Sequence, residues 1–369
     1  MKLTTATLTT LLPALALAGR GGGHGGGHGK PYPSDDDLAI EAGKHVIYSY
    51  PGLTPPDSLL ELTRQGKVGG IIVFGENVDE NLGNVMKQFQ DAYAEGPAYS
   101  GSPLFMMTDQ EGGKVRRLPG GPVDTAKVTG QSADPAAAGA EAGATAAAVL
   151  TKYANNCNLA PVLDVYRTPE NFLDKVGRSY GNTSELVSTC ATAYLSAQQS
   201  ADVIAAAKHF PGLGAAGDEN TDLQVVTIDT SLEELREIDM APYVDAIAAD
   251  VGMVMMSWAV YPALDAEKPA GMSRAWVHDE LRGRLGYKGV TVTDALEAIS
   301  LEPFGNDAQR GLLANAAGVD LLLAAARNAT QGEAVVDALV AGLKDGSVSR
   351  REFRAGTKRI DALRKKLTF

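Results

Sequence analysis

Ionisable side chains stand at the ends of several short apolar segments of this chain. Asp109, Asp164, Lys208, His209 and Asp294 each end or directly follow such a segment. A single carboxylate in this place is often only the N-cap of a following helix. Carboxylates that alternate with cations can instead hold a polyhydroxylated ligand through charge-assisted hydrogen bonds. One carboxylate left unpaired among them can act as a nucleophile on an electrophilic carbon.

From residue 41 onward, strand-like and helix-like segments alternate, and these elements would position the side chains. Short, continuous apolar runs bounded by turn residues are typical of strands that are buried on both faces. Such runs are found at residues 45–49, 69–74, 104–108, 159–164, 203–208, 252–257, 289–293 and 319–323. Helix-like patterns lie between them. The alternation predicts an α/β fold, a single (β/α)8 TIM-type barrel, with an open doubly wound sheet as the alternative.

The helix-like patterns carry recognisable start signals. They cover residues 80–95, 135–156, 184–200, 231–249, 274–285, 307–317 and 331–344. Ser231 followed by Glu234 has the spacing of a capping box. Asp134 before Pro135 combines an N-cap with proline at the first helical position. We therefore expect helices to begin at these two places, and we expect residues 350–365 to form a closing helix.

In a barrel of this kind the active site forms where the carboxyl ends of the strands meet. The loops after the third and fourth strands add arginines to the strand-end residues. The charged residues expected at this rim are Asp109, Arg117, Asp164, Arg178, Lys208, His209 and Asp294. Their mixture of charges predicts a binding site for a ligand that is rich in hydroxyl groups.

The start of the chain has the pattern of a targeting signal. A basic start and a short apolar stretch end in Ala16-Leu17-Ala18, which fits a small-x-small cleavage site. A disordered tail is the alternative. We predict a signal peptide over residues 1–18, a Gly/His-rich linker over residues 19–34 and the barrel domain over residues 35–369. The signal peptide predicts a secreted, extracellular protein.

Composition excludes several functional classes. The formal net charge is −12, from 33 Lys and Arg against 45 Asp and Glu, and no basic stripe compensates it. This argues against a nucleic-acid partner, and no later segment is long enough to span a membrane. No nucleotide, cofactor or metal motif is found, so we expect no cofactor and no metal site. Cys157 and Cys190 either pair in a disulfide or remain separate buried thiols, and Asn182 and Asn328 begin candidate glycosylation triplets.

Five longer motifs stand out along the chain. Residues 109–115 read D-Q-E-G-G-K-V, residues 160–165 read A-P-V-L-D-V and residues 177–181 read G-R-S-Y-G. Residues 208–212 read K-H-F-P-G, and residues 285–294 read L-G-Y-K-G-V-T-V-T-D. In this order they resemble motifs of one known family, glycoside hydrolase family three, in its β-N-acetylglucosaminidase branch. The corresponding motifs of that branch are D-x-E-G-G-R-V, A-P-V-L-D-V, R-S-F-G, K-H-F-P-G and L-G-F-x-G-V-V-x-S-D, and the last of them presents the nucleophile.

The resemblance implies a (β/α)8 barrel and a glycosidase that retains configuration through a covalent glycosyl-enzyme intermediate. By motif match Asp294 would be the nucleophile. Asp164 is a further candidate for substrate binding, included only because it ends a strand. The expected reaction is hydrolysis of terminal β-linked N-acetylglucosamine, and the expected partner is that carbohydrate. The residues that would bind the sugar are Asp109, Arg117, Arg178, Lys208 and His209.

The loop after K-H-F-P-G departs from the family pattern. The branch usually continues with H-G and then a flexible loop carrying D-S-H, whose Asp–His pair serves as acid/base. Here Leu213 replaces the first histidine, and Thr221 stands where the second would be. Glu219 takes the position of the family's aspartate and is our first candidate for the acid/base, with Asp218 and Asp222 as alternatives. The other interpretation is a solvated acidic loop.

Other functions stay open at this point. A β-glucosidase or β-xylosidase of the same family is one, because contacts to an acetamido group cannot be identified from the sequence. A phosphorolytic variant would suit a missing acid. A catalytically weak sugar-binding protein would have kept the pocket and lost the proton donor. In another enzyme class, Lys208 could form a Schiff base, as in barrel aldolases, although no motif resembles such a family.

Overall fold

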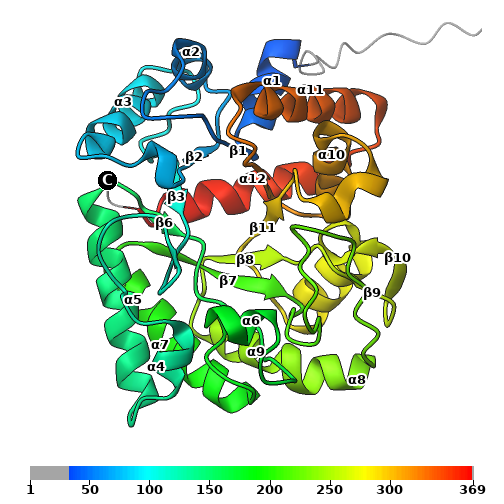
Figure 1. Ribbon diagram of the computed structural model, residues 1–369. Helices are drawn as coiled ribbons and strands as arrows, with labels where there is room; N and C mark the ends of the chain where they lie inside the picture. The colour runs from blue at the N-terminus through cyan, green and yellow to red at the C-terminus, as the bar shows by residue number, and fades with distance from the viewer. Residues whose placement is uncertain (1–32, 368–369) are drawn as a thin grey trace, which may run out of the picture. The chain divides into compact units, whose positions relative to one another are not determined.

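Eight short buried strands form a closed parallel barrel in the computed structural model, which describes residues 33–367. Strand β12 pairs with β1 in parallel register, Leu322 opposite Val46, and this pairing closes the barrel. The predicted barrel is therefore confirmed (Figure 1). Around the barrel the strands are β1 (Val46–Tyr48), β2 (Gly70–Ile72), β3 (Phe105–Thr108), β6 (Cys157–Asn158), β7 (Ile204–Phe210), β8 (Met253–Met256), β11 (Val290–Ala295) and β12 (Leu321–Ala324).

Helices alternate with these strands and surround them (Figure 1). The predicted start signals are confirmed, because Ser231 Oγ accepts from Glu234 N at 3.1 Å and Asp134 Oδ1 accepts from Ala137 N at 3.1 Å. The helices are α1 (Asp35–Gly43), α2 (Asp57–Arg64), α3 (Leu82–Ala94), α4 (Ala126–Gly130), α5 (Pro135–Lys152), α6 (Phe172–Val176), α7 (Ser184–Gln199), α8 (Leu232–Glu234), α9 (Ala241–Ala248), α10 (Asp307–Ala317), α11 (Ala329–Asp345) and α12 (Arg350–Arg364).

Short helical segments and two small ribbons lie between the main strands and helices. The 3-10 turns are η1 (Gly75–Asn77), η3 (Ala270–Met272) and η5 (Ile299–Phe304), and the π-helical segments are η2 (Leu235–Asp239) and η4 (Ala275–Arg284). Two small antiparallel ribbons pair β4 (Gln110–Gly112) with β5 (Val115–Arg116) and β9 (Val260–Tyr261) with β10 (Asp265–Pro269).

Two predicted boundaries differ from the structure because of prolines. The fourth strand was expected over residues 159–164, but Pro161 has no N–H for the ladder, so β6 pairs earlier, at Cys157 and Asn158. Single hydrogen bonds to β7 continue beyond β6, because Ala160 O and Pro161 O accept from Ala206 N and Lys208 N at 3.0 and 3.2 Å, and Leu163 N donates to Lys208 O at 2.7 Å. The helix expected over residues 231–249 is divided into α8, η2 and α9, and Pro242 lies in the first turn of α9.

The barrel interior is apolar along most of its length, and α12 covers its amino-terminal end. Side chains such as Phe105, Met107 and Met255 pack inside, in one cluster with Ile360 and Leu363 of α12. Polar contacts fix the helix to the starts of several strands. Arg359 makes two hydrogen bonds to the Asp320 carboxylate before β12, at 2.6 and 3.0 Å, and Arg364 donates to Gly69 O before β2. The predicted closing helix is thus confirmed.

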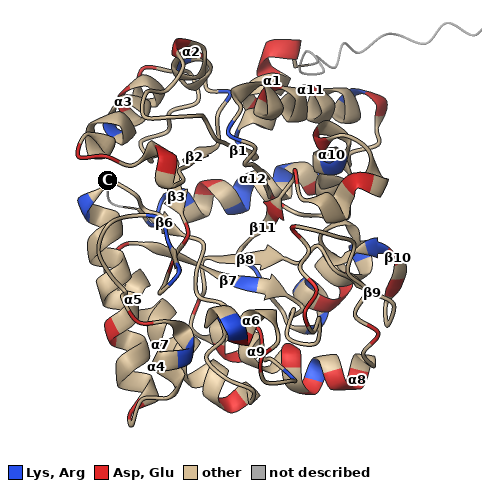
Figure 2. Ribbon diagram, in the orientation of Figure 1, with Lys and Arg blue, Asp and Glu red and all other residues tan. Residues whose placement is uncertain are grey.

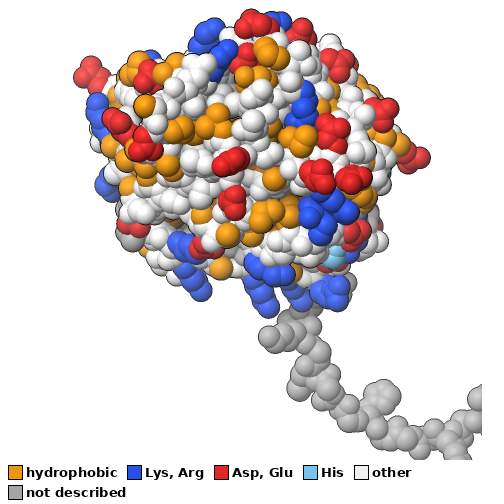
Figure 3. Space-filling model, turned by 90° about the horizontal axis from the view of Figure 1, so that it is seen from below, with side chains coloured by type: hydrophobic (Ala, Val, Ile, Leu, Met, Phe, Trp, Pro, Cys, Tyr) orange, Lys and Arg blue, Asp and Glu red, His pale blue; other side chains and the backbone are white. Residues whose placement is uncertain are grey.

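Several remaining predictions have mixed outcomes. Cys157 and Cys190 are both buried and free, so the separate-thiol alternative is correct in this structure. Within residues 33–367 no helix is long and apolar enough to cross a membrane. Seen from below, the surface intersperses acidic, basic and apolar side chains, with a group of Lys and Arg along one edge (Figure 3). The predicted signal peptide and most of the linker lie outside the described residues.

Candidate active site

A cavity of about 290 Å³ opens at the carboxyl end of the barrel strands. Its lining comes from loops that are far apart in the sequence, which is the arrangement expected for a barrel active site. A blue segment of the ribbon marks the lysine of β7, which contributes to this cavity (Figure 2). Of the predicted site residues, those that line the cavity are Asp109, Arg117, Arg178, Lys208, His209, Asp222 and Asp294.

The ribbon β4–β5 presents two carboxylates to the cavity. Asp109 and Glu111 flank Gln110, whose buried amide accepts from Leu118 N at 3.0 Å and donates to Gly121 O at 2.8 Å. This anchoring turns the flanking residues to the other side of the ribbon, as alternation in an extended chain requires. Gly112 follows with φ +123°, and a Cβ there would lie 2.7 Å from Asp124 O. The motif therefore needs glycine at this turn.

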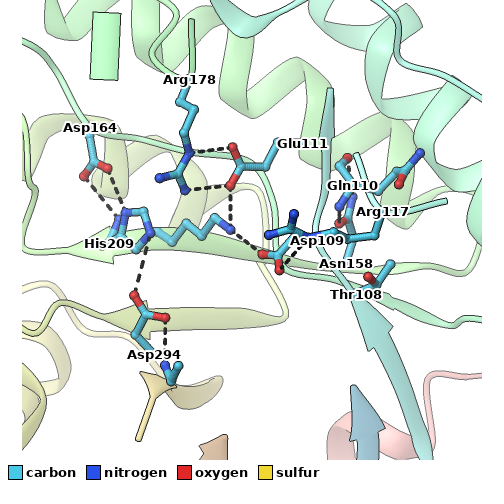
Figure 4. A network of polar contacts seen from close by, with 12 residues as sticks. Thr108, Asp109, Gln110, Glu111, Arg117, Asn158, Asp164, Arg178, His209 and Asp294 are labelled. Carbon is cyan, nitrogen blue, oxygen red and sulfur yellow. Dashed lines mark hydrogen bonds and ion pairs between the residues drawn. The ribbon is translucent and has the colours of Figure 1, made fainter. Parts of the chain in front are cut away.

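Two cations hold these carboxylates (Figure 4). Lys208 Nζ lies 2.8 Å from Asp109 Oδ1 and 2.7 Å from Glu111 Oε1. Arg178 binds Glu111 in bidentate fashion, with Nε–Oε2 at 2.9 Å and Nη2–Oε1 at 2.7 Å. Arg117 approaches the other oxygen of Asp109 only to 4.0 Å. Asp109 therefore keeps an oxygen that is loosely paired and available to a ligand, whereas Glu111 is saturated.

Burial and charge act in opposite directions in this network. Burial alone would raise the pKa of Glu111, but Arg178 and Lys208 outweigh it and hold that pKa below its usual range. Burial would lower the pKa of Lys208, but Asp109 and Glu111 raise it above the ordinary value for lysine. Glu111 is therefore ionised and the Lys208 amine is protonated near neutral pH.

His209 is fixed from behind by Asp164. The imidazole Nδ1 lies 2.8 Å from Asp164 Oδ2, and Asp164 Oδ1 accepts from the backbone N–H groups of His209 and Leu213 at 3.2 and 2.8 Å. Asp164 is fully buried and is not among the cavity-lining residues. This differs from the predicted substrate contact, because both of its oxygens are occupied by the protein. Asp164 instead orients the imidazole, with Nε2 toward Asp294.

Asp294 stands at the carboxyl end of β11 and faces the cavity. Its Oδ1 accepts from Ala295 N at 2.7 Å, and its Oδ2 lies 4.0 Å from His209 Nε2. Burial raises the pKa of Asp294, the charge of His209 lowers it, and the charge of Asp222 raises it again. Unlike Asp109 and Glu111, Asp294 has a backbone N–H rather than a lysine or arginine as its direct partner. This leaves Oδ2 free to approach a bound molecule.

The three acidic residues after K-H-F-P-G have different surroundings. We call residues 213–225 the acidic loop. Asp218 pairs with Lys175 at 2.9 Å on the exposed surface. The carboxylate of Glu219 accepts from Gln224 Nε2 at 3.0 Å, and Glu219 does not line the cavity. Asp222 does line it. The structure thus places the first-choice acid/base outside the site and one of its alternatives inside.

The sequence did not single out every residue that the cavity uses. Glu111 was visible in the D-Q-E-G-G motif, but its pairing with Arg178 and Lys208 depends on three separate loops. Phe74 and Phe172 also line the cavity. The ring of Phe74 is covered by the Arg327 guanidinium, whose carbon lies 4.3 Å from the ring centroid. Within residues 33–367 no group of three or more His, Cys, Asp or Glu could hold a metal ion.

The fold and this site define a class of protein. The model of the glycosyl hydrolase family 3 N-terminal domain matches residues 48–363. The chain therefore belongs to glycoside hydrolase family 3, and it is a glycoside hydrolase. This confirms the resemblance that the motifs had indicated.

Similar proteins agree with this assignment. A protein described as an uncharacterized secreted glycosyl hydrolase from Arthroderma benhamiae is 56% identical over 333 residues, covering 90% of this chain and 94% of that protein. A β-hexosaminidase of Tolumonas auensis is 31% identical, covering 82% and 87% of the two chains.

Solved structures resemble the whole barrel. A β-N-acetylhexosaminidase from Beutenbergia cavernae superposes with a TM-score of 0.80 at 31% identity, covering 89% of this chain and 98% of that chain. A family 3 β-N-acetylglucosaminidase from Paenibacillus gives a TM-score of 0.83 at 32% identity, but this chain spans only 62% of its length.

Proposed function

We propose that this protein is a retaining β-N-acetylhexosaminidase that releases terminal β-linked N-acetylglucosamine. The observation that carries the proposal is Asp294, whose direct partner is the Ala295 N–H, in a cavity where Lys208 and Arg178 already hold the carboxylates of Asp109 and Glu111. The relatives named β-hexosaminidase support the choice of sugar. The covalent step follows from the chemistry of a carboxylate beside an anomeric carbon.

In the proposed reaction Asp294 Oδ2 attacks the anomeric carbon as the bond to the leaving oxygen breaks. The glycosyl–Asp294 ester is then hydrolysed by water, and two inversions give net retention. The nucleophile must be ionised to attack. His209 and Lys208 favour the ionised form of Asp294, against the effect of burial and of Asp222. Asp164 keeps the imidazole in place for this task.

The paired charges would hold the sugar. Asp109 and Lys208 offer acceptors and donors to hydroxyl groups, and Arg117, which is partly exposed, can approach from the rim. Glu111 would act indirectly, by fixing the Arg178 guanidinium and the Lys208 amine in place. This arrangement is rigid before substrate arrives, so little ordering cost remains to be met on binding.

We propose Asp222 as the acid/base, in place of our first candidate, Glu219. Of the three acids of the acidic loop, it is the one that lines the cavity together with Asp294. Its charge is close enough to raise the pKa of Asp294. A carboxylic acid at this place would protonate the leaving oxygen, and its carboxylate would then activate the water that cleaves the ester.

The other functions considered are less well supported. The Lys208 amine is held protonated between two carboxylates, and a protonated amine cannot form a Schiff base. A glucosidase, a phosphorolytic variant or a weak sugar-binding protein would each use the same cavity. For secretion, the proposal rests on the pattern of residues 1–18 and on the name of the Arthroderma relative.

Hydrolysis of paired aryl glycosides tests the proposed function. The protein should cleave an aryl N-acetyl-β-glucosaminide much faster than the matching aryl β-glucoside, and NMR should show the β-anomer as the first product. A first product of α configuration would contradict retention. Preference for the glucoside would favour the glucosidase alternative. Binding of N-acetylglucosamine without turnover of either substrate would favour the sugar-binding protein, and faster turnover with added phosphate would favour the phosphorolytic one.

A further inference from the structure

Two loops meet at the mouth of the cavity, beside Asp222. Ile299 N donates to Asp222 O at 3.4 Å, and Ser300 N donates to Thr221 O at 3.3 Å. The acidic loop is thereby joined to the start of η5, in the loop that follows β11 and Asp294. These contacts hold the backbones of the two loops together beside Asp222.

Two large apolar side chains are exposed at this junction. Leu223, the residue after Asp222, is 66% exposed, and Ile299 is 44% exposed. A single exposed leucine is ordinary in a soluble protein and needs no explanation. Here the two residues come from different loops that are hydrogen-bonded to each other: Leu223 follows Asp222, which lines the cavity, and Ile299 N donates to Asp222 O. Position, rather than exposure, sets them apart.

We propose that Leu223 and Ile299 form an apolar lip that binds the leaving group of the glycoside. The inference rests on the proposed function, in which Asp222 protonates the oxygen between the sugar and the leaving group. Whatever is attached to that oxygen must then lie next to the neighbours of Asp222. The sugar itself enters the charged part of the cavity, around Asp109 and Lys208.

The lip selects a class of leaving group. A pyranose ring presents C–H groups on its faces, and an aromatic aglycone presents a flat apolar surface; both remove apolar surface from water when they cover Leu223 and Ile299. A methyl group is too small to cover the lip. The ligand of this subsite is therefore a ring, with a second N-acetylglucosamine as the form that the proposed function favours. An aryl ring is the second source of the same chemistry.

The test compares two substrates that differ in the leaving group alone. Leu223→Ser and the double variant Leu223→Ser/Ile299→Ser should lower kcat/KM for N,N′-diacetylchitobiose about threefold to tenfold, through a higher KM. The methyl N-acetyl-β-glucosaminide should lose less than about twofold. Val244→Ser is the matched control, because Val244 is 53% exposed on α9, outside the cavity lining. Leu223→Met should restore the disaccharide preference.

The outcomes separate this inference from the proposed function. Equal losses on both substrates, or none on either, would overturn the lip. A loss confined to an aryl N-acetyl-β-glucosaminide, with the disaccharide unaffected, would assign the lip to aryl leaving groups instead of a second sugar. Wild-type protein that cleaves neither glycoside would overturn the proposed function, and the lip with it. The methyl glycoside also shows that each variant is folded, because its turnover needs the intact cavity.

Discussion

Replacement of Asp222 by asparagine should separate substrates by the quality of their leaving group. Loss of a general acid slows the step that it assists by roughly 10²–10⁴-fold. This loss should fall on alkyl glycosides and on the disaccharide, whose leaving oxygens need a proton. Aryl glycosides with acidic leaving groups depart unassisted, so their first step should be nearly unchanged. Added azide should restore the second step, because an anionic nucleophile needs no general base.

The same variant should change the pH dependence in a predictable direction. The pKa of Asp294 is raised by burial, lowered by His209 and raised by the charge of Asp222. Activity requires ionised Asp294, so a raised pKa moves the acid limb of kcat/KM to higher pH. Asp222→Asn removes one of the causes that raise this pKa. The acid limb, measured on an activated aryl glycoside, should therefore move to lower pH than in the wild-type protein.

Glu219→Gln is the matched control in the same loop. Glu219 is exposed, is bound to Gln224 and does not line the cavity, so its replacement should change either rate by less than about twofold. Stopped-flow measurements on aryl glycosides of graded leaving-group acidity would show, for each variant, how the rate of the first step depends on the pKa of the leaving group. A steep dependence in Glu219→Gln, with none in Asp222→Asn, would refute the assignment and return the role to Glu219.

Three further predictions concern the nucleophile, the sugar-binding cations and the start of the secreted chain. Asp294→Asn should abolish nearly all turnover, while calorimetry should still detect binding of N-acetylglucosamine. A mechanism-based fluoro glycoside should label Asp294 in the wild-type protein, and labelling of Asp109 instead would contradict the role of Asp294 as nucleophile. Arg178→Ala and Lys208→Ala should each weaken sugar binding by about 1.5–3 kcal/mol, roughly tenfold to 150-fold in KM or Kd; unchanged values for both would place the sugar elsewhere. N-terminal sequencing of secreted protein should begin near Gly19, and intact Met1 in the medium would remove the signal-peptide interpretation.

Much of the barrel could be predicted because its strands are short, apolar and regularly spaced. The pattern failed where proline changes which backbone groups can pair. Pro161 moves the fourth strand toward Cys157, and Pro242 stands where an expected single helix is interrupted. Local spacing does reveal caps, since Ser231 and Asp134 accept the hydrogen bonds that their positions predict.

The expectation that active-site residues lie at the carboxyl ends of the strands located most of the site. It could not distinguish a residue that contacts the ligand from one that only positions its neighbours. Lys208 lies near the carboxyl end of β7 and Asp294 near that of β11, and both line the cavity, as expected. Asp164 also ends the predicted fourth strand, but the turn at His209 and Leu213 folds back over it and takes both of its oxygens. Burial of this kind depends on contacts more than forty residues apart, which no local pattern records.

The choice between the acids of the acidic loop depends on contacts of the same kind. Counting positions from K-H-F-P-G gave Glu219, because it aligns with the acidic member of the family's pair. In the structure Asp222 lines the cavity, and backbone hydrogen bonds from Ile299 and Ser300 join the acidic loop to the loop after β11. Those bonds join segments almost eighty residues apart. A count along one loop cannot anticipate them.

The missing loop histidine and the fixed loop can be understood together. A carboxylate that works beside a histidine can rely on that neighbour for orientation, but a carboxylate that works alone needs its own backbone to be held. Thr221 stands where the histidine was expected; it is 4% exposed, and its carbonyl oxygen accepts from Ser300 N at 3.3 Å. A small buried residue at this place lets the two loops approach closely enough for the backbone bonds to form. Thr221, at the position expected for the family's histidine, thus carries one of the two backbone hydrogen bonds that join the acidic loop to the loop after β11, beside Asp222, where the proposed proton transfer requires a defined distance to the leaving oxygen.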